Sequence, residues 1–408
     1  MSELAIHGGP KACEHEWSSW PIWDDRERAG LNAVLESGEW WYGERVREFE
    51  ERYAAFHGAK YGITASSGTT ALETCLAVLE IGAGDEVIIP PYTFVATASS
   101  VLRSNAIPVF ADIEPHTLCL DPDDVERKIT PRTKAIMPVH LGGHMADMDR
   151  LGEIARARNI TLIEDACHAW GSQWKGKGAG AVGHCGVFSF QVSKNINSGE
   201  GGIILTDDED IADMCRGFTN CGRRKGKAWY AHYSLGSNLR LTEFQAAILL
   251  AQLERYPEQL ALREENARIL NDALRGLPGI GLVETDPRMT RRSYHFYTFR
   301  IDSEALGVSR ERFLEAAQAE GVPVREGYPH PLYTNELFQC IEENGIPAHH
   351  GWPFGHEVPD YKQVSCPVTE QVCADTCWIM HTVLLADPSA IADMAAAIRK
   401  VVSHIGEL

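Results

Sequence analysis

Residues 66–72, Ser-Ser-Gly-Thr-Thr-Ala-Leu, follow a short β-rich run and open a helical pattern. A turn of small residues at a helix N-terminus presents free backbone N–H groups and the positive end of the helix dipole, which suit a phosphate group. The hydroxyls of Ser67, Thr69 and Thr70, next to Gly68, add further donors. Serine and threonine are also common helix caps. The segment is therefore a candidate phosphate site, with a plain cap as the alternative.

Asp165 is a second candidate, because it ends the apolar run Leu162-Ile163 with Glu164 before it. The carboxyl end of a strand is where α/β sheets place their ligands. A carboxylate there can pair with a protonated ring nitrogen. The alternative is a structural hydrogen-bonding role.

Lys194 follows the apolar run 187–190 and precedes the glycine-rich segment 199–202. Burial or a neighbouring positive charge lowers the pKa of an amine and makes it a nucleophile toward aldehydes. Alone, such a lysine is an ordinary surface charge. Taken in chain order, however, the three segments offer one partner each to the phosphate, the pyridine nitrogen and the aldehyde of pyridoxal 5′-phosphate.

These segments lie where short β-rich runs alternate with helical patterns, which is typical of a parallel sheet with crossover helices. Helical patterns include residues 69–80 and 146–158. The β-rich runs are residues 61–64, 86–90, 108–113, 134–140, 161–165, 187–190 and 203–206. We predict an α/β fold with a mostly parallel sheet sandwiched by helices.

The pattern changes after a long helical stretch at residues 241–275 and the turn signals Pro278-Gly279 and Asp286-Pro287. The chain then has strand-like runs at 297–301 and 322–325, with helical patterns at 309–319 and 389–405. We predict a large domain over residues 1–275, including the N-terminal segment, and a smaller C-terminal α+β domain over residues 276–408.

Composition excludes several classes of protein. The 408 residues include 38 Lys and Arg against 57 Asp and Glu, a net charge of −19, which argues against nucleic acid as a partner. The N-terminus lacks a signal sequence, and no apolar run reaches the roughly 18–20 residues of a membrane helix. Eleven scattered cysteines suit free thiols in a reducing compartment. We expect a cytoplasmic protein with no membrane partner.

Other patterns are interpreted without a ligand. The glycines of residues 178–183 match a dinucleotide fingerprint but precede a strand, whereas the fingerprint follows one. His140 and His144 have zinc-like spacing, but Leu141-Gly142-Gly143 between them indicates a loop. Cys373 and Cys377 are expected on one helix face as buried thiols. The basic run 223–227 indicates a solvated loop, with attraction of an anionic ligand as the alternative. No metal site is predicted.

The chain resembles the DegT–StrS family of fold-type-I, pyridoxal-phosphate-dependent aminotransferases, which aminate keto-sugars and keto-cyclitols. The matching motifs are numerous, ordered along nearly the whole chain, and lie at residues 43–56, 67–72, 84–94, 139–149, 164–166, 189–202 and 238–247.

The resemblance implies a role for individual residues. Lys194 would form a Schiff base with the cofactor and then move a proton, and Asp165 would hold the pyridine nitrogen protonated. Phe94 would stack on the cofactor ring, with His168 near its phenolic oxygen. Gly68, Thr69, Thr70 and Ser189 would bind the phosphate. Asn238 would reach the phosphate of a neighbouring subunit's cofactor, which implies a homodimer with shared active sites.

The motif around Ser189, Gln191 and residues 198–202 resembles the branch that acts on inosose-type cyclitols and in aminohydroxybenzoate formation, often with L-glutamine as donor. The implied function is ping-pong transfer of an amino group from L-glutamine or L-glutamate to a polyhydroxylated ketone. His330 and Tyr333 are candidate acceptor residues, with a structural role as the alternative. The rival functions are a nucleotide-sugar aminotransferase, a related sugar dehydratase, which Lys194 disfavours because histidine replaces the lysine there, and a cofactor-binding regulator without turnover.

Overall fold

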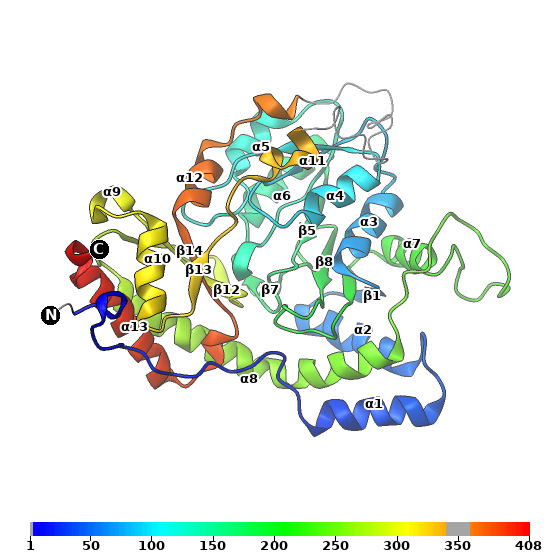
Figure 1. The fold of residues 1–408 in the computed structure, drawn as a ribbon. Coiled ribbons are helices and arrows are strands. Elements are labelled where there is room, and N and C mark those ends of the chain that lie inside the picture. Colours follow the sequence, from blue (N-terminus) through cyan, green and yellow to red (C-terminus); the bar gives the residue numbers. More distant parts are fainter. Residues whose placement is uncertain (1–2, 340–359) are drawn as a thin grey trace.

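The computed structural model describes residues 3–339 and 360–408, and its centre is a seven-stranded sheet (Figure 1). The strand order is β1-β9-β8-β5-β4-β2-β3. All strands run parallel except β9, which pairs antiparallel with both β1 and β8. The prediction of a mostly parallel sheet is confirmed. The strands are β1 (Tyr61–Ala65), β2 (Glu86–Ile89), β3 (Ile107–Phe110), β4 (Thr133–Ile136), β5 (Thr161–Asp165), β8 (Cys185–Ser189) and β9 (Gly202–Thr206).

Helices cover both faces of this sheet, because both faces of its strands are apolar. Ile163, Val187 and Ile204 belong to one buried cluster, whereas the adjacent Leu162, Phe188 and Ile203 belong to another. The first cluster includes residues of α3 (Gly68–Val78), α4 (Ala96–Arg103) and α7 (Glu209–Thr219). The second includes residues of α2 (Glu44–His57), α5 (Pro122–Lys128), α6 (Met148–Arg158) and α8 (Glu243–Leu274). The helix α1 (Asp25–Ser37) packs against α8.

A second, four-stranded sheet follows in the chain, in the antiparallel order β10-β12-β14-β13. Its strands are β10 (Ile280–Leu282), β12 (Phe296–Ile301), β13 (Val324–Glu326) and β14 (Thr376–Met380), and nearby helices are α9 (Ser303–Leu306), α10 (Arg310–Ala319), α11 (Glu336–Gln339), α12 (Pro367–Asp375) and α13 (Pro388–Ser403). One prediction here is wrong: Cys377 lies in β14, whereas Cys373 lies in α12. The strand was hidden in the sequence because its apolar residues continue a helical pattern.

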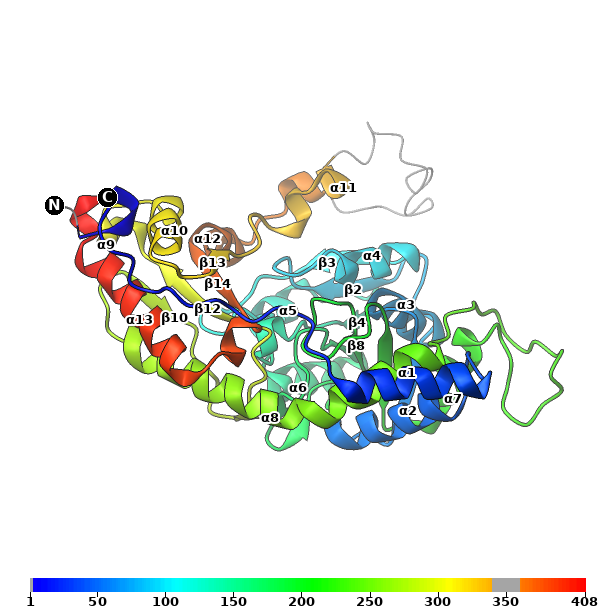
Figure 2. The same ribbon diagram turned by 60° about the horizontal axis from the view of Figure 1, so that its bottom comes forward.

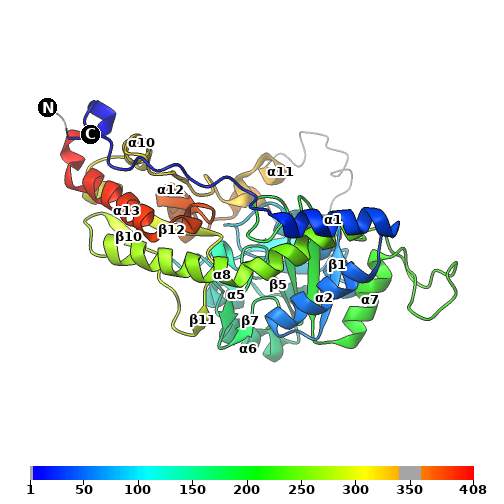
Figure 3. The ribbon, with the colours of Figure 1, turned by 90° about the horizontal axis from the view of Figure 1, so that it is seen from below.

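The 32-residue helix α8 joins the two halves of the molecule (Figure 3). At 1.5 Å per residue it is about 48 Å long. Leu253 and Leu260 belong to the core of the large sheet, whereas Leu270 and Leu274 belong to the core of the second sheet. The N-terminal segment also joins that second core through Leu4, and then runs along the molecule to α1 (Figure 2). A division between domains at residue 275 stays a prediction.

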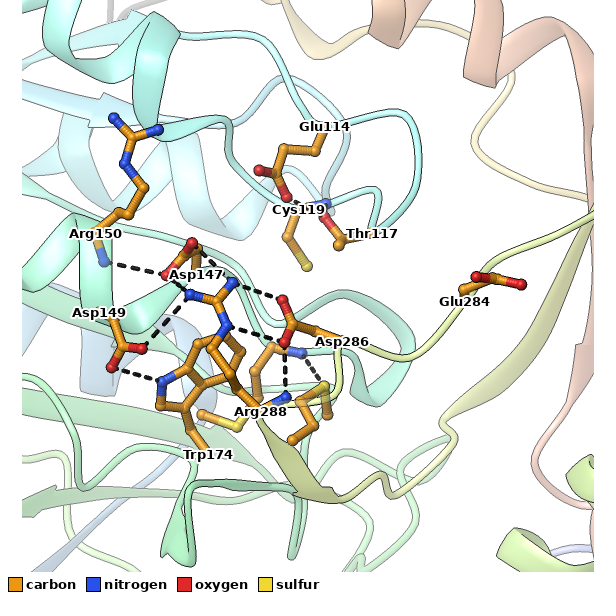
Figure 4. A network of polar contacts seen from close by, with 12 residues as sticks. Glu114, Thr117, Cys119, Asp147, Asp149, Arg150, Trp174, Glu284, Asp286 and Arg288 are labelled. Atoms are coloured by element: carbon orange, nitrogen blue, oxygen red, sulfur yellow. Dashed lines mark hydrogen bonds and ion pairs between the residues drawn. The ribbon is translucent and has the colours of Figure 1, made fainter.

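The segment between β10 and β12 returns to the large sheet and is anchored there by Arg288 (Figure 4). Its guanidinium donates two hydrogen bonds of 2.9 Å to Asp147, at the start of α6, and bonds of 3.0 and 2.6 Å to Asp286. Its carbon lies 4.5 Å from the centre of the Trp174 ring. Hydrogen bonding to Arg288 lowers the pKa of Asp286. The strands β6 (Gln173–Trp174), β7 (Lys177–Gly178) and β11 (Met289–Arg291) form a small sheet at this anchor.

Glu243, the first residue of α8, fixes the start of another helix. Its carboxylate accepts hydrogen bonds of 2.8, 3.0 and 3.0 Å from the backbone N–H groups of Gly43, Arg45 and Val46, at the N-terminus of α2. The first N–H groups of a helix have no partner within the helix, so a carboxylate there satisfies them and interacts favourably with the helix dipole.

We predict that Glu243→Ala lowers the free energy of unfolding by about 3 kcal/mol, because it leaves one buried and two partly buried N–H groups without an acceptor. The measurement is a urea titration followed by circular dichroism. Glu258→Ala, at an exposed position of the same helix, is the control and should leave the transition unchanged. Equal stability of the two variants would contradict the assignment.

Candidate active site

The parallel strands β1, β5 and β8 end at the same edge of the sheet, and the residues that follow them surround a cavity of about 570 Å³. Ser67, Gly68 and Thr69 line it after β1, Asp165 and His168 at the end of β5, and Ser189 and Lys194 at the end of β8. The opposite wall comes from Arg325, Trp378 and Met380 of the second sheet and from Tyr328, which follows β13. The structure thus brings together the three segments that the sequence predicts.

The N-terminus of α3 forms one end of the cavity. Ser67 caps the helix by accepting a hydrogen bond of 3.1 Å from the Thr70 N–H, and the Thr70 hydroxyl accepts one of 3.0 Å from the Ser67 N–H. Both side chains therefore serve the cap, and Thr70 is not among the residues that line the cavity. Gly68 is required by packing, because a Cβ atom there would lie 2.8 Å from the Cβ of Ser189. This contact brings the helix N-terminus against the end of β8.

Asp165 lies at the wall of the cavity and is held by two donors. Its Oδ2 accepts a hydrogen bond of 2.7 Å from the Thr97 hydroxyl, and its Oδ1 accepts one of 3.2 Å from the N–H of Cys167. Asp165 is buried. Among the described residues no cation forms an ion pair with this carboxylate, which leaves it free to face a positively charged ligand atom.

Glu164, its neighbour in the chain, points to a different environment. Its two oxygens accept hydrogen bonds from the His140 ring at 2.8 Å and from the N–H groups of Gly180, Val182 and Gly183 at 2.8, 2.7 and 2.6 Å. The segment that matches a dinucleotide fingerprint therefore binds this buried carboxylate. Within the described residues no group of three or more histidine, cysteine or acidic side chains could hold a metal ion.

Lys194 lies in the turn after β8, where its N–H donates to the carbonyl of Gln191 at 2.8 Å. Its amine is 5.8 Å from the centre of the buried Trp170 ring. Burial lowers the pKa of Lys194, whereas the nearby Cys167 and Asp165 oppose that shift. The amine is therefore closer to its nucleophilic, neutral form than an exposed lysine is.

His168 is a neutral histidine beside this amine. Burial, followed by the charge of Lys194, lowers the pKa of His168 well below its usual value. Its ring lies 4.5 Å from the ring of His295. Its Nδ1 atom is buried and has no hydrogen-bond partner within the described part of the chain. That orphaned atom indicates that a ligand belongs in this region.

Of the remaining residues that the sequence predicts for the site, only Phe94 lines the cavity. Phe94 lines the cavity and is 58% exposed, so one face of its ring is available. Asn238 lies outside this cavity and pairs with Asn220. Tyr333 is buried, donates to Glu370 at 2.7 Å and accepts from the N–H of Cys366 at 3.1 Å.

His330 is exposed, and a ring nitrogen lies 3.2 Å from Asn335 Oδ1. Neither His330 nor Tyr333 lines the cavity of this chain, and their role in acceptor binding stays a prediction.

Sequence reasoning missed Thr97, His295, Tyr328 and Trp378, which also line the cavity. Thr97 carries a usable signal, because it stands one helical turn after Thr93 in a segment that follows a predicted strand. The other three come from elements far along the chain, and only folding places them opposite Lys194.

The fold and the cavity define a class of protein, the fold-type-I transferases, in which the ligand site lies at the carboxyl edge of a mostly parallel sheet. Residues 21–399 match the DegT/DnrJ/EryC1/StrS aminotransferase family, and the chain belongs to that family. It is an aminotransferase.

Similar proteins agree with this assignment. An L-glutamine:2-deoxy-scyllo-inosose aminotransferase from Micromonospora echinospora is 38% identical over 427 residues, which cover 100% of each chain. The crystal structure of 3-amino-5-hydroxybenzoic acid (AHBA) synthase is 35% identical, with a TM-score of 0.85 over 96% of this chain and 99% of that chain. NtdA from Bacillus subtilis, solved with bound cofactor PMP, is 26% identical, with a TM-score of 0.80 over 97% of this chain and 87% of that chain.

We predict that the Lys194 amine in the full-length, cofactor-free chain titrates below the ordinary lysine value of about 10.4. Burial is the cause, because it disfavours the ammonium form. Competitive labelling of amines by trace acetic anhydride across a pH series, with peptide mass spectrometry, measures the midpoint for each lysine. The exposed Lys225 provides the internal reference. Identical midpoints for the two lysines would contradict the prediction.

Proposed function

We propose that this aminotransferase holds pyridoxal 5′-phosphate in the cavity at the carboxyl edge of its sheet. With it, the enzyme would move an amino group from L-glutamine or L-glutamate to an inosose-type keto-cyclitol or a keto-sugar by a ping-pong reaction. The observation that carries the proposal is the convergence of Lys194, Asp165 and the N-terminus of α3 on one cavity. A nucleophilic amine, a carboxylate and a phosphate-binding helix end match the three polar parts of that cofactor.

The described residues fit the cofactor. The N-terminus of α3, with Gly68 and Thr69 at the cavity wall and Ser189 beside them, would hold the phosphate. Asp165 would accept a hydrogen bond from the pyridine nitrogen, since Thr97 and the Cys167 N–H leave part of its acceptor capacity free. The buried Nδ1 of His168 has no hydrogen-bond partner among the described residues, and a substituent on the cofactor ring would supply one. Phe94, with its exposed ring, would stack on the pyridine ring.

The chain's residues then divide the work. When bound, pyridoxal phosphate supplies an electron sink for the negative charge that develops at the donor's α-carbon. Lys194, with its lowered pKa, would accept the proton from that carbon and then donate it to a carbon of the cofactor. Asp165 would keep the ring nitrogen protonated, and the apolar wall formed by Trp378 and Tyr328 would keep water away.

The donor and acceptor follow from the relatives' printed names, which pair L-glutamine with inosose-type ketones. A nucleotide-sugar acceptor is the main alternative within the family. A sugar dehydratase is disfavoured, because an amine and not an imidazole occupies position 194. A regulator that binds the cofactor without turnover would give no keto acid with any donor.

We also propose that the chain is a cytoplasmic homodimer. The described residues contain no helix long and apolar enough to cross a membrane. Large apolar side chains are exposed in two segments, at Trp40 and Trp41 and at Trp229, Tyr230 and Leu235. The guanidinium carbon of Arg240 lies 5.0 Å from the centre of the Trp41 ring. Exposed apolar groups of this kind favour association, and Asn238, next to them in the chain, would reach the partner's cofactor phosphate.

We predict that Lys194→Ala abolishes release of 2-oxo acid from glutamine and glutamate, because no other lysine among the described residues lines the cavity. The measurement is single-turnover production of the keto acid, together with the absorbance of the cofactor. Lys225→Ala, at an exposed loop position, is the matched control and should behave as wild type. Wild-type rates in Lys194→Ala would end the proposal.

Asp165→Asn should slow proton removal from the donor by about a hundredfold or more, because the ring nitrogen loses its negatively charged partner. The amide still accepts from the Thr97 hydroxyl, so the fold should persist. The test is the primary isotope effect and rate with α-deuterated glutamate. An unchanged rate would show that the carboxylate does not face the ring nitrogen.

A half-reaction screen identifies the substrates. The enzyme is incubated with glutamine, glutamate or alanine, and then with inosose-type ketones or nucleotide-linked keto-sugars. Mass spectrometry of the aminated product distinguishes the two branches. If only the nucleotide-linked ketone is aminated, the acceptor is a sugar and the proposal of a keto-cyclitol acceptor is wrong.

A further inference from the structure

A buried histidine holds the residue that precedes Lys194. The Nε2 of His381 lies 2.9 Å from the carbonyl oxygen of Ser193. The Nδ1 of the same ring lies 3.2 Å from Nη2 of Arg263, and a guanidinium can only donate. Nδ1 is therefore the acceptor, which leaves the proton on Nε2 and makes it the donor to Ser193. Arg263 thus selects the tautomer of His381 that binds the lysine turn.

A second histidine holds the residue that follows Lys194. The buried Asn195 donates through Nδ2 to the carbonyls of Ser293 and Tyr294 at 3.3 and 3.2 Å. Its Oδ1 accepts a hydrogen bond of 2.9 Å from Nδ1 of His295. The rings of His295 and His381 are stacked, with centres 5.3 Å apart and planes 23° apart. The two stacked histidines therefore contact the turn on both sides of the lysine, His381 through Ser193 and His295 through Asn195.

Arg263 is unusual because it is fully buried without a carboxylate. Among the described residues no acid forms an ion pair with it, and its Nη1 has no hydrogen-bond partner. Its other contacts are the carbonyl of His381 at 3.3 Å and the rings of Trp20 and Tyr256, at 6.0 and 5.8 Å from its guanidinium carbon. Burial lowers the pKa of Arg263 to about 10. Burying an uncompensated cation costs several kcal/mol, a cost that packing alone does not explain.

The elements that carry these groups are themselves fixed. Arg263 lies in α8, which spans both hydrophobic cores, and His381 directly follows β14. His295 follows the segment that Arg288 anchors to Asp147 (Figure 4). The position of the turn that carries Lys194 therefore depends on the second sheet as well as on the strand that precedes the turn.

We propose that Arg263 and His381 are positioning residues for Lys194: the buried guanidinium fixes the His381 tautomer, and the hydrogen bond to Ser193 keeps the lysine turn in place at the wall of the cavity. This inference rests on the proposed role of Lys194. Loss of either residue lets the turn move and exposes the partly buried amine further to water. The groups facing the amine are Asp165, Cys167, His168, His295 and His381, and none of them is changed by Arg263→Met.

The test is the labelling midpoint of Lys194 in the full-length, cofactor-free chain. Arg263→Met and His381→Phe should raise it by about one pH unit, which corresponds to about tenfold less neutral amine at a given pH. Phenylalanine keeps the ring stacked on His295 and leaves the Arg263 charge in place, so this variant isolates the lost hydrogen bonds. His381→Gln, whose amide can both donate and accept, should restore most of the wild-type midpoint. Amide hydrogen exchange of residues 191–198 should speed up in the two disruptive variants alone.

Arg268→Met is the control, because Arg268 lies on the same helix, is exposed and pairs with Asp272. It should leave the midpoint and the exchange unchanged. A Lys194 midpoint that stays at the wild-type value in a folded Arg263→Met or His381→Phe chain overturns the proposal. If Arg263→Met does not fold, the comparison of His381→Phe with His381→Gln decides. Failure of the wild-type chain to bind pyridoxal phosphate would remove the proposed function, and the midpoints would still report on the positioning.

Discussion

The partial burial of one amine is the constraint on which the site depends. An ammonium group is stabilised by hydration, so a partly buried lysine loses part of that stabilisation and gives up its proton more easily. Lys194 meets this condition, because burial lowers its pKa against the opposing effects of Cys167 and Asp165. Because the lowered pKa depends on this partial burial, a movement of the turn that carries Lys194 would restore hydration of the amine and reduce the shift. The contacts of the second sheet and of α8 with the lysine turn, through His381 and Arg263, hold the turn in place.

Adjacent residues of one strand end show how the fold separates structural charge from available charge. Glu164 is saturated by a histidine and three backbone N–H groups, and its charge stabilises the loop that wraps it. Asp165 receives only two donors and faces the cavity. The difference arises because successive side chains of a strand point to opposite faces of the sheet. Two neighbouring carboxylates thus have different roles because their side chains point in different directions.

The second sheet completes the site in addition to stabilising its own core. With Trp378, and with Tyr328 just after β13, it provides the wall opposite Lys194, and β14 leads into His381, which contacts the lysine turn. The long helix α8 links this sheet to the first, because its side chains enter both hydrophobic cores. The Arg288 network anchors the connecting segment on the other side. The positions of the two walls are therefore coupled by elements that do not touch the ligand space.

The sequence alone indicated the strands of the large sheet and part of the local chemistry, but not β14. Short β-rich runs located the strands of that sheet, and small residues at a strand end located the N-terminus of α3, because both signals are encoded within a few neighbouring residues. It also identified Lys194 and Asp165 from their places beyond apolar runs.

Only the tertiary structure decided which side chains meet. It directed Glu164 away from the cavity, placed Tyr333 in a hydrogen bond with Glu370, and brought together Arg263 and His381, 118 residues apart, so that His381 reaches the lysine turn. Such contacts depend on packing between distant segments, and no local pattern in the chain records which distant surfaces will face each other.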